Sequence, residues 1–205
     1  MTGNGSERVT RVPAAAGALM ALLNSRPHAV PVLPDKLADP RQAAEILGAF
    51  APPDLGDAPD PAGTWPTREP AVERLERVRA LRSDLMAVVE AADAEETARR
   101  WEALTARTSD HTFVLTFAGP TPGVRQVSGD PLTGRILASV AELVRDGNWS
   151  RIRVCGSDAC RGVFYDTTRN RTQRWHSYEL CGNRANVAAF RARKNPASTA
   201  AARPS

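Results

Sequence analysis

Four residues with the chemistry of metal ligands lie close together near the end of the 205-residue chain. Cys155 and Cys160 form one pair, His176 and Cys181 form a second, and four residues separate the members of each pair. Cysteine thiolates and a histidine nitrogen suit a tetrahedral zinc ion, with bonds of about 2.3 Å to sulfur and about 2.0–2.1 Å to nitrogen. Because four protein ligands fill that geometry, no position remains for a catalytic water, and the expected zinc is structural.

Two other interpretations of these residues are open. The three cysteines of the chain could be unrelated, with His176 a surface histidine, or two of them could form a disulfide. An odd number of cysteines weighs against the disulfide. So does the N-terminus, because Met1–Ser6 lacks the basic and apolar order of a secretory leader. We therefore expect a cytoplasmic protein, in which thiolates stay reduced, and no apolar run predicts contact with a membrane.

The elements around the four ligands can be predicted from local patterns. Arg151–Val154 alternates in polarity and Gly162–Tyr165 reads as its partner strand, so the first ligand pair would lie at the tip of a β-hairpin. Ser177 is a suitable N-cap for a helix that runs to about Lys194. Cys181 would then lie in the first helical turn, where backbone N–H groups favour a thiolate. A hairpin tip and a helix start that share one metal form a treble-clef-like zinc finger.

A resemblance to a known family supports this interpretation. The run Arg174–Asn186 reads RWHSYELCGNRAN and resembles the CGNR zinc finger family, with the similarity extending over about 151–194. The three cysteines fall on cysteine positions of that family. His176 stands where many members have cysteine.

The resemblance also implies a domain organisation. Members of the family usually carry an N-terminal domain called ABATE, which is described as a stress-induced transcription regulator. We expect this domain at residues 13–148, the zinc finger at 149–195, and disordered tails at 1–12 and 196–205. One ABATE motif is similar to the segment around Asn24, but Ala21 stands where the family has an acid. We therefore interpret Asn24 as the end of a helix.

The first 148 residues are expected to be mainly helical, which makes the whole chain α+β. Apolar residues recur at helical spacing in 14–24, 69–92 and 131–147. Asp39, Asp93 and Asp130 each have the position of a helix N-cap, and two of them precede a proline. Residues 111–127 predict a β-hairpin, and the proline-rich stretch 51–66 predicts an irregular loop.

Charge divides the chain between these two parts. Residues 151–195 contain ten Arg and Lys against three Asp and Glu, a charge of +7, whereas residues 1–150 carry −4. A basic module indicates a polyanionic partner, although a solvated basic surface would give the same count. The candidate nucleic-acid contacts are Arg169, Arg171, Arg174, Arg184, Asn186, Arg191, Arg193 and Lys194. Asn183 and Arg184 adjoin Cys181 and could instead brace the zinc site.

The function these patterns favour is DNA binding by a transcription regulator with one structural zinc per chain. The resemblance suggests that its N-terminal domain senses a small ligand between the helices and the 111–127 hairpin, and a homodimer is an option. The alternative is a zinc-stabilised module that binds proteins or RNA without sequence-specific DNA binding. No phosphate loop, nucleophile elbow or carboxylate pair is visible, so we do not expect an enzyme. We also expect Phe164, Tyr165, Val187 and Phe190 to form a small core beside the metal.

Overall fold

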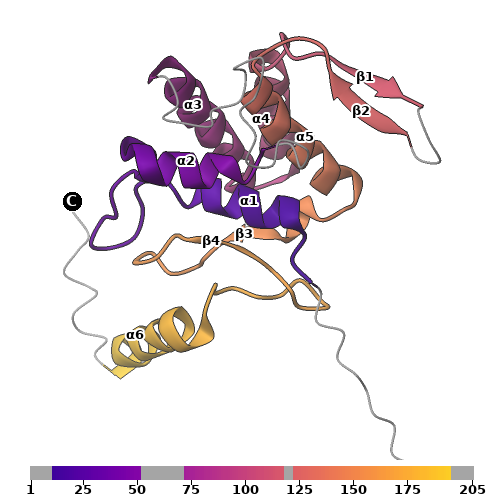
Figure 1. The fold of residues 1–205 in the computed structure, drawn as a ribbon. Helices are drawn as coiled ribbons and strands as arrows, with labels where there is room; N and C mark the ends of the chain where they lie inside the picture. Colours follow the sequence, from indigo (N-terminus) through magenta and orange to yellow (C-terminus); the bar gives the residue numbers. More distant parts are fainter. Residues whose placement is uncertain (1–10, 52–71, 118–121, 195–205) are drawn as a thin grey trace, which may run out of the picture.

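Helix α1 (Ala14–Leu23) is the element around which the others pack (Figure 1). The structure is a computed structural model that describes residues 11–51, 72–117 and 122–194. Helix α1 contacts strand β4 (Val163–Tyr165) and the helices α2 (Pro40–Gly48), α3 (Val72–Val89) and α5 (Pro131–Arg145), with which it forms the helical body. Helix α4 (Ala94–Arg107) packs against α3. Most of both predicted tails and of the 51–66 loop lie outside the described residues.

The core of this body is made of leucines and other large apolar side chains at helical spacing. Each contributes about 1.5–3 kcal/mol on burial. Val72, which the spacing assigns to the same stripe, is instead 74% exposed at the first turn of α3. The large apolar side chains that are at most 2% exposed are Leu19, Leu22, Leu23, Leu37, Leu47, Val78, Leu81, Leu85, Leu132, Ile136 and Leu143.

The three predicted aspartate caps are confirmed. The Asp39 carboxylate accepts hydrogen bonds from the backbone N–H groups of Arg41 and Gln42, both at 2.9 Å. Asp93 accepts from the Glu96 N–H at 2.8 Å, and Asp130 accepts from the Thr133 N–H at 2.9 Å. These bonds satisfy N–H groups that a helix start otherwise leaves unpaired, which is why α2, α4 and α5 begin where the sequence predicts.

The predicted hairpin in 111–127 is present as β1 (Phe113–Thr116) and β2 (Gly123–Gln126). The strands are antiparallel, and Leu115 lies opposite Val124. In Figure 1 this hairpin lies at the opposite end of the molecule from α6. It therefore contributes nothing to the arrangement of the four metal ligands.

A second antiparallel hairpin joins the body to the metal ligands. After the short 3₁₀ turn η2 (Trp149–Arg151), strand β3 (Ile152–Val154) pairs with β4 (Val163–Tyr165). Ile152, Val163 and Tyr165 belong to the same buried cluster as the leucines of the helices. Trp149 also packs against Trp101 of α4 with the two rings tilted by 57° and their centroids 5.1 Å apart. One face of the hairpin is thus part of the body, as its short connection to α5 leads us to expect.

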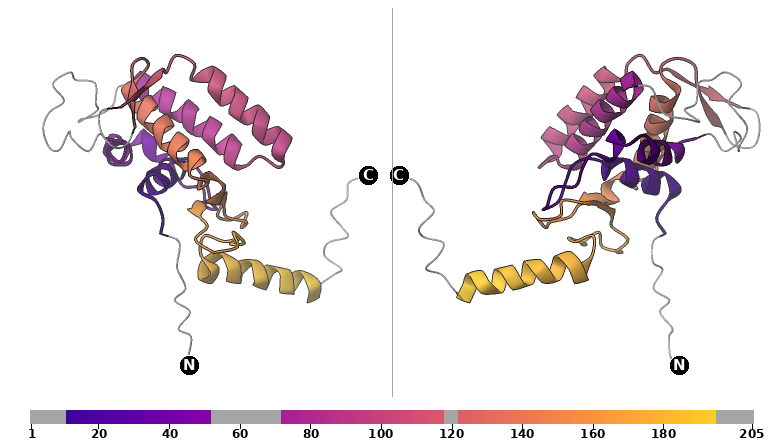
Figure 2. Two further views of the ribbon diagram at one scale, coloured as in Figure 1. Left: turned by 90° about the vertical axis from the view of Figure 1, so that its right-hand side faces the viewer. Right: turned by 60° about the vertical axis from the view of Figure 1, so that its left-hand side comes forward.

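The last helix, α6 (Asn183–Lys194), projects away from the body (Figure 2). It follows the single π-helical turn η3 (Tyr178–Gly182), which is its main contact. The predicted small core beside the metal is therefore mostly wrong. Phe164 packs there with Cys155 and Cys181, but Tyr165 is buried in the cluster of the body, Val187 is 49% exposed and Phe190 is 58% exposed. Among the helices the structure describes, none is both long and apolar enough to cross a bilayer.

Candidate metal centre

The four predicted ligands come together. The sulfur atoms of Cys155, Cys160 and Cys181 and a ring nitrogen of His176 all lie within 4.8 Å of one another. Cys155 and Cys160 flank the turn that links β3 to β4, and Cys181 lies in η3. The two elements predicted from sequence, a hairpin tip and a helix start, therefore supply the ligands as in a treble-clef-like finger.

The distances fit a tetrahedral zinc ion. His176 Nδ1 lies 3.3 Å from the sulfur of Cys160 and 3.5 Å from that of Cys181. Zn–S and Zn–N bonds of ordinary length at a tetrahedral angle place sulfur and nitrogen about 3.6 Å apart. Nδ1 is therefore the histidine atom positioned to bind the metal.

The protonation of the thiols also indicates a cation. Burial raises the pKa of Cys181, and the neighbouring thiols of Cys155 and Cys160 raise it further, to about 12. Burial also raises the pKa of Cys155, but hydrogen bonds with His176 and other groups outweigh it and bring that pKa to about 7. Three thiols in one cluster cannot all be ionised at neutral pH unless a positive charge lies among them, and a divalent metal supplies it.

The surroundings of the ligands suit a structural metal. Cys155 is fully buried and Cys181 is 5% exposed, and both pack with Phe164 and Trp175. The Gly162 N–H lies 3.4 Å from the Cys160 sulfur, a contact that stabilises a thiolate. Three cysteines and one histidine with this spacing fit one structural zinc per chain.

The helix start that carries Cys181 is capped as predicted. Ser177 Oγ accepts a hydrogen bond from the Leu180 N–H at 3.2 Å, and the Ser177 carbonyl accepts from the Cys181 N–H at 3.0 Å. The turn itself is π-helical, so its backbone is wider than the α-helical turn that we expect from sequence.

Asp166 organises the loop between the ligand pairs. Its side chain is fully buried, and its carboxylate accepts from the backbone N–H groups of Thr168 at 2.9 Å and Gln173 at 3.0 Å. Burial raises the pKa of Asp166, but these donors and Arg153 together lower it below its ordinary value. Arg153 also donates to the Arg171 carbonyl at 2.9 Å. These bonds hold the loop in one shape between the two ligand pairs.

The end of α1 is hydrogen-bonded to the hairpin β3–β4, here called the zinc hairpin. The Asn24 side chain donates to the Val163 carbonyl at 2.8 Å and accepts from the Val163 N–H at 2.7 Å. Asn24 does end α1, as expected, and it also pairs with β4 in the way that a neighbouring strand would. Nearby, Arg26 donates to the Arg161 carbonyl at 2.6 Å and the Val30 N–H donates to the Ala159 carbonyl at 2.9 Å.

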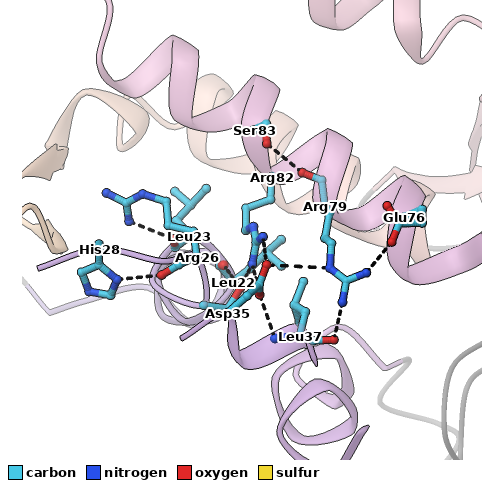
Figure 3. A network of polar contacts seen from close by, with 11 residues as sticks. Leu22, Leu23, Arg26, His28, Asp35, Leu37, Glu76, Arg79, Arg82 and Ser83 are labelled. Carbon is cyan, nitrogen blue, oxygen red and sulfur yellow. Dashed lines mark hydrogen bonds and ion pairs between the residues drawn. The ribbon is translucent and has the colours of Figure 1, made fainter. Parts of the chain in front are cut away.

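A buried polar network holds the segment that makes these contacts (Figure 3). Arg82 of α3 donates to both carboxylate oxygens of Asp35, at 2.8 and 2.6 Å, and to the Ser25 hydroxyl at 2.6 Å. The hydrogen bonds from Arg82 lower the pKa of Asp35 more than burial raises it. Arg79 donates to the Leu37 carbonyl at 2.8 Å. Helix α3 thereby fixes the two ends of the 25–35 segment, which touches the hairpin tip.

The predicted nucleic-acid contacts lie on two neighbouring parts of residues 151–194, here called the zinc segment. Arg171 donates to the Ser150 hydroxyl at 2.7 Å, and the Arg174 guanidinium lies 4.9 Å from the centroid of the Trp175 ring. Asn186 donates to the Tyr178 hydroxyl at 3.3 Å. All eight candidates are exposed: Arg169, Arg171 and Arg174 on the loop, and Arg184, Asn186, Arg191, Arg193 and Lys194 on α6.

Three cations of this segment have structural roles that the sequence did not reveal. Arg151 donates to the carbonyls of Asp166 and Thr168, both at 2.9 Å, and Arg153 contacts the Asp166 carboxylate at 3.3 Å. Arg161 pairs with Glu90 at the end of α3 at 2.7 Å. Within the described residues, the seven other cations of the segment pair with no carboxylate.

The ligand pocket expected beside the 111–127 hairpin stays a prediction. A groove of about 490 Å³ lies in another place, between the end of α3 and strand β3. Its lining includes Glu90, Trp149, Arg153 and Arg161. It therefore lies between the body and the zinc hairpin.

Comparison with known proteins agrees with the geometry of the ligands. Residues 151–194 match the model of the CGNR zinc finger family. The matched segment is less than a quarter of the chain and contains all four ligands. No curated protein matches the chain. The ABATE domain expected at residues 13–148 remains a prediction from resemblance.

Proposed function

We propose that this protein is a DNA-binding transcription regulator whose zinc segment contacts the nucleic acid. The observation that carries the proposal is the set of seven cations without carboxylate partners among the described residues. They lie on the 166–175 loop and on α6, next to a metal site that fixes both elements. Unpaired arginines and lysines are the side chains that neutralise backbone phosphates.

The shape of the segment supports contact with a large ligand. Helix α6 projects from the body (Figure 2), and the burial of its residues shows that Arg184, Arg191, Arg193 and Lys194 are all exposed. A helix of 12 residues that carries four cations and no acid can lie along a groove of the duplex. Asn186 and Arg191 are of the types that contact adenine and guanine edges there.

In this proposal the zinc has no catalytic part. Three thiolates and one imidazole complete a tetrahedron, so no open position remains for a reacting water. The metal fixes the loop arginines relative to α6, and the body holds the hairpin from the other side. We therefore propose a binding protein and not an enzyme, with the body as the part that would respond to a ligand.

A second candidate function, binding of a protein partner, is favoured by the apolar residues of α6. Val187 and Phe190 lie on one face of the helix, between Arg184 and Arg191 on one side and Asn186 and Arg193 on the other. An apolar stripe with basic edges fits an acidic, apolar groove of another protein. Binding to duplex DNA separates the two candidates.

The test is a fluorescence anisotropy titration of the zinc-loaded full chain against labelled genomic duplex at increasing salt. Each phosphate contact contributes about −0.9 to the log–log slope, so Arg193→Ala with Lys194→Ala should flatten the slope by about two units. The matched control is Arg99→Ala with Arg100→Ala on α4, which removes the same charge from surface pairs with Glu95 and Glu96. If the wild-type protein binds no duplex at low salt, the regulator proposal fails and the protein-interaction candidate replaces it.

A further inference from the structure

A groove of about 360 Å³ lies beside the zinc ligands and differs in chemistry from the rest of the basic segment. Its lining consists of Thr172, Gln173, Arg174, Trp175 and Tyr178. The volume is within the range of about 300–1,000 Å³ typical of small-molecule sites. The groove thus combines two aromatic rings, a cation, an amide and a hydroxyl, and no acidic side chain lines it.

Two glycines allow the aromatic rings to lie where they do. A Cβ atom at Gly182 would lie 2.7 Å from Tyr178 Cδ2 and 3.0 Å from Trp175 Cδ1. A Cβ atom at Gly156 would lie 3.1 Å from Trp175 Cζ3. Any larger residue at position 182 would displace at least one ring. The backbone next to two metal ligands, Cys155 and Cys181, is therefore shaped to seat this aromatic pair.

Both rings are held in place, yet Tyr178 is open to solvent. Tyr178 is 60% exposed, and its hydroxyl accepts a hydrogen bond of 3.3 Å from the side chain of Asn186 on α6. Gln173 donates to the Trp175 carbonyl at 2.9 Å, and the Arg174 guanidinium covers the Trp175 ring at 4.9 Å. An exposed ring that a hydrogen bond and a close glycine orient loses little freedom when a planar group stacks on it.

We propose that this groove binds one unpaired nucleobase of a nucleic acid strand. The base stacks on Tyr178, and the phosphates of the strand contact Arg174 and Arg169. Stacking on aromatic side chains beside a basic groove is how proteins hold unpaired bases, and it is worth about 1–3 kcal/mol per base. The positive charge of the segment excludes cationic ligands and attracts the backbone. The inference rests on the proposed nucleic-acid function and adds a site that a closed duplex cannot fill, because its bases are already stacked.

The test compares strands with duplex in the same zinc-loaded full chain. Labelled oligodeoxyuridylate, oligouridylate and a duplex are titrated at low salt by anisotropy. Tyr178→Ala should weaken binding of the single strands by about 5- to 150-fold, the equivalent of about 1–3 kcal/mol, and leave duplex affinity unchanged. Tyr178→Phe keeps the ring and should bind the strands nearly as well as the wild-type protein. A preference between the two oligonucleotides tells whether the strand is DNA or RNA.

Phe190→Ala is the matched control. Phe190 is an aromatic residue of similar exposure, 58%, that lies on α6 and does not line the groove. This change should leave single-strand binding as it is. Equal losses from Tyr178→Ala and Phe190→Ala, or no loss from either, would overturn the nucleobase site.

A second measurement does not depend on whether a variant folds. Wild-type protein is crosslinked by light to an oligonucleotide that carries 5-iodouracil, and the adduct is located by mass spectrometry. Adducts on Tyr178 or Trp175 are expected, and adducts confined to α6 contradict the proposal. If duplex binds but the strands do not, only this site fails, whereas loss of both kinds of binding in the wild-type protein removes the proposed function as well.

Discussion

The helical body and the zinc segment, residues 151–194, reach a defined structure by different physical means. The body buries a continuous set of leucines, isoleucine and valine between its helices. The buried cluster of the zinc segment consists of Cys155, Phe164 and Cys181. A segment this short cannot bury enough apolar surface to offset its loss of conformational entropy. A metal and a set of polar contacts around Asp166 take the place of that core.

The two regions also differ in how the charged side chains at their surfaces are paired. Several arginines of the body pair with carboxylates, among them Arg99 and Arg100 on α4, whose partners Glu95 and Glu96 lie one helical turn away. The arginines of the 169–174 loop and of α6 have no such partner within the described residues. A surface ion pair adds little to the stability of the fold and attracts few other charges. Arginines without an acidic partner on a rigid support attract a polyanion. The proposed nucleic-acid binding by the zinc segment rests on this difference in charge pairing.

Removal of the metal should have the largest effect, and it should unfold one of the two regions and not the other. Structural zinc contributes about 10–16 kcal/mol to small zinc modules at pH 7. Chelation, or Cys155→Ser, should unfold the loop and α6 while the helices of the body stay folded. Backbone NMR spectra of the full chain would show resonances of the C-terminal segment collapsing and those of α1 to α5 persisting.

The matching control is His176→Cys, which keeps four soft ligands and should still bind one zinc. Elemental analysis of freshly purified, tag-free protein gives the stoichiometry. Protein without stoichiometric metal would contradict the structural role of zinc in this segment.

The body should depend instead on its buried ion pair. Asp35→Ala leaves Arg82, whose side chain is 6% exposed, without its carboxylate partner, and should cost about 3–5 kcal/mol. Because the folded-state pKa of Asp35 is depressed, this stabilisation is present above the unfolded pKa of about 3.9 and is lost as pH falls through the folded value. Urea unfolding at neutral pH measures the loss. Glu95→Ala, which breaks an exposed pair with Arg99, should change stability by less than about 1 kcal/mol.

Zinc affinity should depend on pH in two steps. In the metal-free protein the pKa of Cys181 is about 12, so zinc displaces a proton from this thiol at every pH between 6 and 8. Cys155, with a pKa of about 7, releases a second proton only below that value. The Cys181 proton alone should therefore lower affinity tenfold per pH unit, about 2.7 kcal/mol from pH 8 to pH 6, and the Cys155 proton should add to this loss and steepen it below pH 7. Competition with a chelator at each pH gives the slope, and a flat profile would contradict the involvement of thiols.

Much of this architecture could be predicted from the sequence because the signals are local. Ligand spacing identified all four metal ligands, and aspartate before a helix start located α2, α4 and α5. The hairpins follow from alternating strands near turn residues. Each of these signals is complete within about ten residues, so a single sequence contains it.

The features that could not be predicted depend on distant partners. A helical spacing indicates that Val187 and Phe190 share a face, but not whether another element covers that face. From the sequence alone Arg153 is one more surface cation. Its contact with Asp166 exists only in the folded protein, because the pairing of β3 with β4 brings the two residues together. The bond between Asn24 and β4 joins residues 139 positions apart and belongs to no periodic pattern.

Asn24 gives the finest test, because its side chain joins the two regions that the comparison separates. Asn24→Ala removes two hydrogen bonds and leaves the N–H and carbonyl of Val163 without their partner, which should cost about 1–3 kcal/mol of stability. Asn186→Ala, which loses one exposed bond of 3.3 Å, should cost much less. If the two regions were independent, Asn24→Ala would lower the stability of the body and leave zinc affinity unchanged. Because Asn24 fixes β4 directly after the Cys160 turn, we expect weaker zinc binding as well, by up to about tenfold, the range found when groups that orient metal ligands are removed. Paired urea unfolding and zinc competition on the two variants would decide between a coupled and an independent zinc segment.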